Sequence, residues 1–107
     1  MKIGKEIRKF LDYELSHYKY YKRKAEKIQD GKYKASTVIK IEDTLERIEN
    51  VKQRLDMGEL EVFNLYYGQN IKNTVKIIGE LSISYSTFNR RINHIIEIAS
   101  EEWGFDI

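Results

Sequence analysis

The stretch LSISYSTFNRRINHI, residues 81–95, decides the fold of the C-terminal half. Ser84 stands just before a run of helical periodicity, where its hydroxyl oxygen can accept a hydrogen bond from a free backbone amide. We therefore expect a helix that begins at residue 85 and ends near residue 101. Its apolar face comprises Phe88, Ile92, Ile95, Ile96 and Ala99. Several polar residues of its first turns are indifferent helix formers, which favours a role in contacting something polar.

A shorter helix is expected just upstream, at about residues 74–81, with Asn73 at its N-cap. Its expected inward residues are Val75, Ile77, Ile78 and Leu81. A short helix and a longer helix, joined by three or four residues with an apolar anchor, make a helix-turn-helix. The sequence therefore predicts a helix-turn-helix whose second helix presents its polar first turns.

Those polar side chains suit the reading of DNA. Arginine matches guanine, asparagine matches adenine, and hydroxyl groups match phosphate oxygens. We expect the helix to enter the major groove, with four residues nearest the base edges and three on flanking phosphates. The four are Ser86, Asn89, Arg90 and Asn93, and the three are Tyr85, Thr87 and Arg91.

Two helices are expected before this module. Apolar residues recur at steps of three and four from residue 3 to 28, which predicts one long helix with a lysine-rich opposite face. A linker, DGKYKAST, then leads to a second helix at about 38–56, with Ser36 or Thr37 as its N-cap. The apolar stripe of that second helix suits either a core face or a coiled-coil seam.

A third, short helix is expected at 59–67, where Gly68 is in position for a left-handed C-terminal cap. Met57 and Gly58 would separate it from the helix before. No strand pattern competes, so the chain is predicted to be all-α. We expect a single domain over 1–107, in which 1–56 provide support or dimerisation and 57–107 form the DNA-binding module.

The composition argues against several classes of protein. Hydrophobic residues make up 41% and charged residues 34% of the 107 residues, as in an ordinary soluble protein. There is no cysteine, which excludes disulfides and thiol chemistry, and no apolar run nears the roughly 18 residues of a membrane span. The charged N-terminus is unlike a secretory signal, so a cytoplasmic protein is expected. The net charge of +2 is uneven, because residues 1–34 hold 11 basic against 5 acidic residues.

Catalysis has little support in the sequence. His17 and His94 lie on different predicted helices, and His94 with Glu97 is a lone pair rather than a metal-ligand pattern. No phosphate-binding glycine loop or nucleophile motif is present. We expect neither an enzyme nor a metal or cofactor.

Residues 60–92, LEVFNLYYGQNIKNTVKIIGELSISYSTFNRRI, resemble region 4 of the sigma-70 family. The first part of the resemblance rests on Glu61, Val62, Phe63, Leu65 and Tyr67, and the second on Ile77, Leu81, Ile83 and Ser84. Lys76, Ile78 and Ser82 depart from the family pattern, where glutamate, alanine and glycine are usual. Small proteins with this module behind a basic helix resemble the ArpU and RinA type of phage regulators. The resemblance implies a late-gene activator that works on double-stranded DNA in a bacterial host.

Three other functions also fit these residues. A phage terminase small subunit also places a helix-turn-helix beside a long oligomerising helix. A protein-interaction module docking on RNA polymerase would instead depend on Tyr66, Tyr67 and the 38–56 helix. A decoy or anti-activator could keep the fold but have lost the ability to bind DNA. The apolar stripe of 41–55 and the aromatic face of 7–28 are the candidate surfaces for the expected homodimer. The sequence leaves the operator, the target genes and the direction of regulation undetermined.

Overall fold

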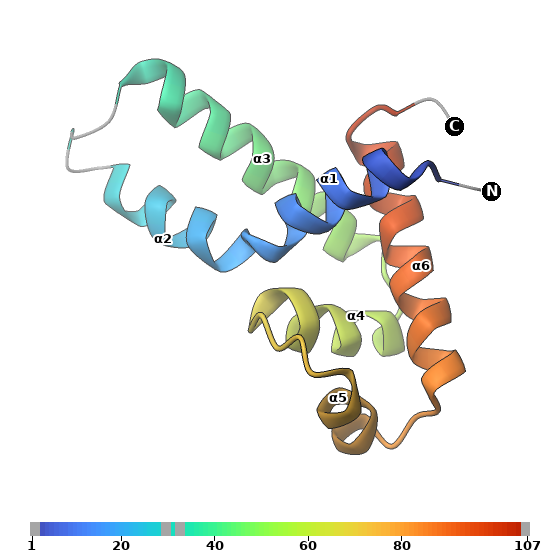
Figure 1. The fold of residues 1–107 in the computed structure, drawn as a ribbon. Helices are drawn as coiled ribbons and strands as arrows, with labels where there is room; N and C mark the ends of the chain where they lie inside the picture. Colours follow the sequence, from blue (N-terminus) through green and yellow to red (C-terminus); the bar gives the residue numbers. More distant parts are fainter. Residues whose placement is uncertain (1–2, 29–30, 32–33, 106–107) are drawn as a thin grey trace.

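The computed structural model describes residues 3–28, 31 and 34–105, and every regular element in that part of the chain is helical (Figure 1). The prediction of an all-α chain is confirmed. The elements are α1 (Lys5–Ser16), α2 (Tyr18–Lys27), α3 (Ala35–Gln53), α4 (Met57–Phe63), the π-helical turn η2 (Asn64–Gly68), α5 (Thr74–Leu81) and α6 (Tyr85–Glu102).

The single helix expected over residues 3–28 is two helices, broken at His17. Its backbone angles, φ −95° and ψ 11°, leave the helical region, and its amide donates to the Glu14 carbonyl at 3.2 Å. The His17 ring nitrogen Nδ1 lies 2.7 Å from the Tyr13 carbonyl oxygen, the group that a continuous α-helix would pair with the His17 amide. The break turns α2 so that it lies along α3 (Figure 1).

The boundaries of α3 also differ from expectation. The helix begins at Ala35 after Lys34, an N-cap residue without a side-chain hydrogen bond, so the prediction of Ser36 or Thr37 as the cap was wrong. Its apolar stripe lies in the chain's own core, with Ile41, Ile48 and Val51 buried. Those side chains act as a core face of this chain.

Met57 begins α4 rather than separating two helices. Asp56 accepts a hydrogen bond from the Glu59 amide at 2.8 Å, and the Glu59 side chain accepts one from the Asp56 amide at 2.9 Å. This reciprocal capping box fixes the start of α4. The expected left-handed cap at Gly68 was wrong, because Gly68 ends η2 and Asn70, with φ 57°, takes the left-handed conformation.

One hydrophobic core connects both halves of the chain. It contains Leu11, Leu15, Tyr18, Ile48, Val51, Val62, Phe63, Tyr67, Ile77, Phe88, Ile92, Ile95, Ile96, Ile98 and Ala99. The prediction that Val75 points inward was wrong, since its side chain is 79% exposed. Val75 precedes the buried Ile77 by two residues, or about 200° around the helix, so the two side chains occupy opposite faces.

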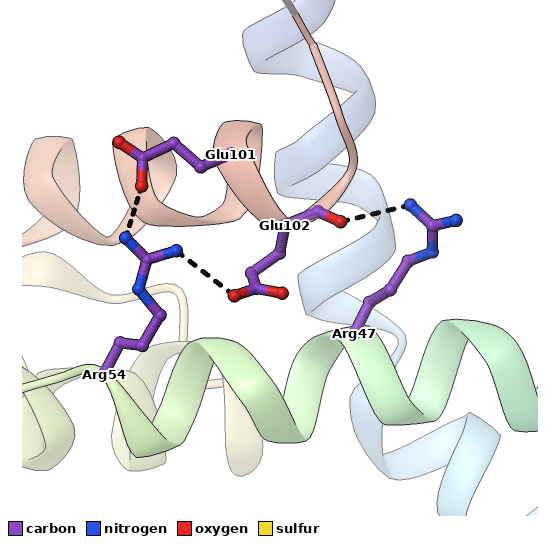
Figure 2. A network of polar contacts seen from close by, with 4 residues as sticks. All are labelled: Arg47, Arg54, Glu101 and Glu102. Carbon is purple, nitrogen blue, oxygen red and sulfur yellow. Dashed lines mark hydrogen bonds and ion pairs between the residues drawn. The ribbon is translucent and has the colours of Figure 1, made fainter.

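Polar contacts close the end of α6 against α3 (Figure 2). Arg54 forms ion pairs with Glu101 and Glu102, the latter at 3.1 Å, and Arg47 donates to the Glu102 carbonyl at 3.2 Å. Gly104, with φ 76°, ends the helix, and the amide of Phe105 donates to the Ser100 carbonyl at 3.0 Å. The C-terminal half of α6 is therefore anchored, and its N-terminal half extends beyond α3 (Figure 1).

Candidate nucleic-acid interface

The first turn of α6 is fixed by Ser84, as the sequence predicted. Its hydroxyl oxygen accepts a hydrogen bond from the Thr87 amide at 3.1 Å. The same hydroxyl donates to the Thr87 side chain at 2.9 Å and lies 3.2 Å from the Ser86 hydroxyl. The cap thus orients the polar residues that follow it.

The turn before α6 depends on a left-handed residue. Ser82, with φ 54° and ψ 46°, occupies the conformation that glycine adopts most easily. The Ile83 amide then donates to the Ile78 carbonyl at 3.2 Å, which closes the end of α5. At the other end of α5, Asn73 accepts a hydrogen bond from the Lys76 amide at 3.2 Å, so the predicted cap is confirmed.

Apolar packing holds the back of α6. Phe88 and Ile92 are buried, and the Phe88 ring meets the Tyr66 ring edge-on with centroids 5.8 Å apart. Because these side chains fix one face of the helix, the opposite face is turned to solvent.

That opposite face carries a shallow hollow. It is lined by Tyr85, Ser86, Asn89, Arg90, Asn93, His94 and Glu97. Five of the seven predicted DNA-binding residues are therefore brought together on one surface. The Tyr85 side chain in this lining is 63% exposed, and Arg90 supplies a positive charge to the hollow.

Two predicted residues lie apart from the hollow. The Thr87 hydroxyl is engaged in the cap, and its side chain is only partly exposed. The Arg91 guanidinium lies over the start of α4, with Nη1 3.5 Å from the Gly58 carbonyl oxygen. A Cβ atom built on Gly58 would come within 2.7 Å of the Arg91 Cζ, so this glycine makes room for the arginine.

Arg8 is a neighbour of this face that was not predicted from the sequence. Its Nη2 donates to Asn93 Oδ1 at 2.7 Å, which connects α1 to the middle of α6. The two residues are 85 positions apart, and no local pattern could have paired them.

His94 also lines this face without having been predicted there, and its ring nitrogen Nδ1 is paired with the buried carboxylate of Glu59. Here a signal existed, because Tyr85, Asn89, Asn93 and Glu97 recur at steps of four and His94 falls beside them.

A second cluster holds α1 over this part of the molecule. The buried Tyr67 donates its hydroxyl hydrogen to Asp12 Oδ1 at 2.9 Å, and burial, followed by the charge of Asp12, raises the pKa of Tyr67 well above its usual value. Lys72 Nζ donates to Ser16 Oγ at 2.7 Å and lies 3.8 Å from the centroid of the Tyr66 ring. Burial lowers the pKa of Lys72, and the charge of Asp12 opposes that shift.

No protein-family model, curated protein or solved structure matches this chain. None of the helices in the described ranges is long and apolar enough to cross a membrane. Within the same ranges, no group of three or more histidine, aspartate or glutamate side chains is arranged to hold a metal ion.

Proposed function

We propose that this protein is a sequence-specific DNA-binding regulator of transcription that inserts the first half of α6 into the major groove. The observation that carries the proposal is the gathering of Tyr85, Ser86, Asn89, Arg90 and Asn93 on one exposed helical face. These side chains offer the donors and acceptors that distinguish base pairs in the major groove.

The supports of α6 favour the same function. A helix that reads DNA must be held rigidly, since misplaced side chains lose their hydrogen bonds with base edges. Ser84 fixes the start of the helix, while Phe88 and Ile92 fix its back. In the proposed complex Arg90 reads guanine, Asn89 and Asn93 read adenine, and Tyr85 contacts a flanking phosphate.

The contacts seen here refine two proposed roles. Arg91 has to leave the Gly58 carbonyl to reach a phosphate, and Thr87 contributes first through the cap. Arg8 orients the Asn93 amide and adds a positive charge beside the reading face. By its resemblance to sigma region 4 and to regulators of the ArpU and RinA type, the protein would activate late genes of a phage in the bacterial cytoplasm, as a homodimer.

The two tyrosines on which the polymerase-docking alternative depends are not exposed. Tyr67 is fully buried and Tyr66 is partly buried against Phe88, so neither is freely presented to a partner. We therefore put DNA reading ahead of the polymerase-docking alternative.

The test is binding to labelled duplex DNA, using fragments that flank the gene beside a random pool, across a range of salt concentrations. Arg90→Ala is expected to weaken binding to the preferred fragment by about 1–3 kcal/mol and to reduce the preference over random DNA. The matched control is Arg23→Ala, which removes an exposed arginine of α2 that does not line the reading face. Equal losses on preferred and random DNA would show that Arg90 contributes charge alone and would refute the base-reading role.

A further inference from the structure

A strip of aromatic side chains runs along the exposed side of α1 and α2 and takes no part in the proposed reading face. Phe10, Tyr13 and Tyr20 are 42%, 56% and 51% exposed, which is unusual for side chains of this size. From Tyr13 onward the rings are neighbours, because the Tyr13 and His17 ring centroids are 4.1 Å apart, those of His17 and Tyr20 6.1 Å, and those of Tyr20 and Tyr21 5.8 Å. Phe10 lines a hollow together with Tyr13, and its ring meets the Phe105 ring edge-on at 5.8 Å. The name aromatic-basic strip is used for the cations described next together with Phe10, Tyr13, His17, Tyr20 and Tyr21.

Three shallow hollows follow the strip, and their charged lining is mostly basic. The first is bordered by Phe10 and Tyr13, the second by His17 and Tyr20, and the third by Tyr20 and Tyr21. The cations that line them are Lys9, Lys19, Arg23, Lys24 and Lys40, whereas the one carboxylate among the lining residues is Glu6. The remaining lining residues are Ser16, Ser36, Thr37, Ile41 and Asn70.

The core does not account for this arrangement. α1 and α2 bury Leu11, Leu15 and Tyr18. Tyr21 packs partly against that core and donates its hydroxyl hydrogen to Glu14 at 2.8 Å. The exposed rings of the strip are therefore those of Phe10, Tyr13 and Tyr20. Exposed aromatic rings that alternate with cations form the surface on which unpaired bases stack while their phosphates are neutralised.

We propose that the aromatic-basic strip binds single-stranded nucleic acid. The aromatic faces favour a single strand over a duplex, because a duplex already stacks its own bases and offers only their edges. Charge favours a polyanion over a second copy of the chain, since two copies pairing through this face would bring the same cations together.

The reach of the strip fits a short segment of nucleic acid. Measured along the path of α1 and α2 through the break at His17, a helical rise of about 1.5 Å per residue from Phe10 to Lys24 gives about 21 Å. That length accommodates about six stacked nucleotides at about 3.4 Å each. DNA and RNA share the bases and phosphates that the strip would recognise.

The test is fluorescence anisotropy with a labelled oligothymidylate and a labelled oligouridylate of about twelve nucleotides, roughly twice that reach. The wild-type chain should bind at least one of them at low salt. Tyr13→Ala and Tyr20→Ala should each weaken binding between about fivefold and 150-fold, the range of one lost stacking contact. Tyr13→Phe keeps the ring and should bind like the wild type.

Charge is tested separately with Lys19→Gln and Arg23→Gln. Each should reduce the slope of log affinity against log salt by about 0.7, the value for one phosphate contact on a single strand. The control for loss of a large exposed side chain is Met57→Ala on α4, outside both proposed surfaces, which should leave single-strand binding unchanged. Tyr85→Ala and Arg90→Ala act on duplex binding instead, so failure of one proposal is distinguishable from failure of the other.

Several results would overturn the proposal. Absence of binding at low salt would do so, as would equal affinities for wild type and both alanine variants. Polyglutamate can be added as a competitor at the same concentration of negative charge as the oligonucleotide. If it displaces the oligonucleotide equally well, the strip binds polyanions or acidic proteins in general. A wild-type dimer that Tyr13→Ala converts to a monomer would identify the strip as a self-association surface. Thermal unfolding of each variant, expected to match the wild type because the rings are exposed, excludes misfolding as the cause of lost binding.

Discussion

Tyr67→Phe should destabilise the protein by about 1.5 kcal/mol, because Tyr67 joins η2 to α1 through a buried hydroxyl. That hydroxyl donates to Asp12 Oδ1 at 2.9 Å and is enclosed in the core. A hydrogen bond to a charged group contributes about 1.5–3 kcal/mol. We take the lower end, since Asp12 is partly exposed and water can replace part of the lost contact. The ring remains in place, so no cavity is added.

The assay is urea unfolding of four proteins, namely the wild type, Tyr67→Phe, Asp12→Ala and the double variant. The coupling energy from this cycle should be about 1–1.5 kcal/mol, because each single change removes the same hydrogen bond. Tyr85→Phe is the matched control, since its hydroxyl is on an exposed ring and the change should alter stability by less than about 0.5 kcal/mol. A coupling below about 0.5 kcal/mol would refute the view that this bond holds α1 in place.

The same bond has a pH signature. Burial raises the pKa of Tyr67 above its usual value of 10, so the folded state keeps the phenol protonated where the unfolded chain loses the proton. The contribution of this group to the free energy of unfolding is therefore complete below pH 10 and is lost as pH rises above 10. The stability difference between wild type and Tyr67→Phe should narrow over that range, and a difference that widens would contradict the assignment.

Two further substitutions test local conformation. Ser82→Gly should raise the free energy of unfolding by about 0.5–1 kcal/mol, because Ser82 is exposed and occupies the left-handed region with φ 54°. Urea unfolding measures this change, and a lower free energy of unfolding in the variant would mean that the Ser82 side chain itself stabilises the fold. Gly58→Ala should be neutral or stabilise by up to about 1 kcal/mol, since alanine favours the helix and the clashing atoms belong to the mobile end of Arg91. The released Arg91 should also raise affinity for random DNA, and a loss of stability above about 1 kcal/mol would show that its guanidinium cannot move.

Local signals predicted the C-terminal part of the fold well. Asn73 and Ser84 cap the helices that they were expected to cap, and the predicted apolar face of α6 is buried. These features depend on residues within one or two turns of each other, where sequence spacing determines which groups meet. Five of the predicted site residues gather for the same reason, because they share one face of one helix.

The features that the sequence did not predict depend on distant contacts or on choices between local hydrogen bonds. The helical period continues through His17, so the apolar spacing does not predict the break, at which the imidazole lies against the Tyr13 carbonyl. The π-helical turn before Gln69, whose amide donates to the Asn64 carbonyl at 2.8 Å, is likewise invisible in the apolar spacing. Arg8 reaches Asn93 only because the core folds α1 across α6.

The arrangement of α6 explains why the two proposed surfaces can be tested independently. Its C-terminal half is enclosed, with Ile95, Ile98 and Ala99 buried, whereas the opposite face of its first half is exposed. α1 packs against this helix and buries Leu11 and Leu15 in the shared core, while the Phe10 and Tyr13 rings are exposed. Since exposed residues carry both surfaces, substitutions there should change binding without changing the core. Loss of duplex preference in Arg90→Ala and loss of single-strand binding in Tyr13→Ala should therefore occur separately, in variants that unfold like the wild type.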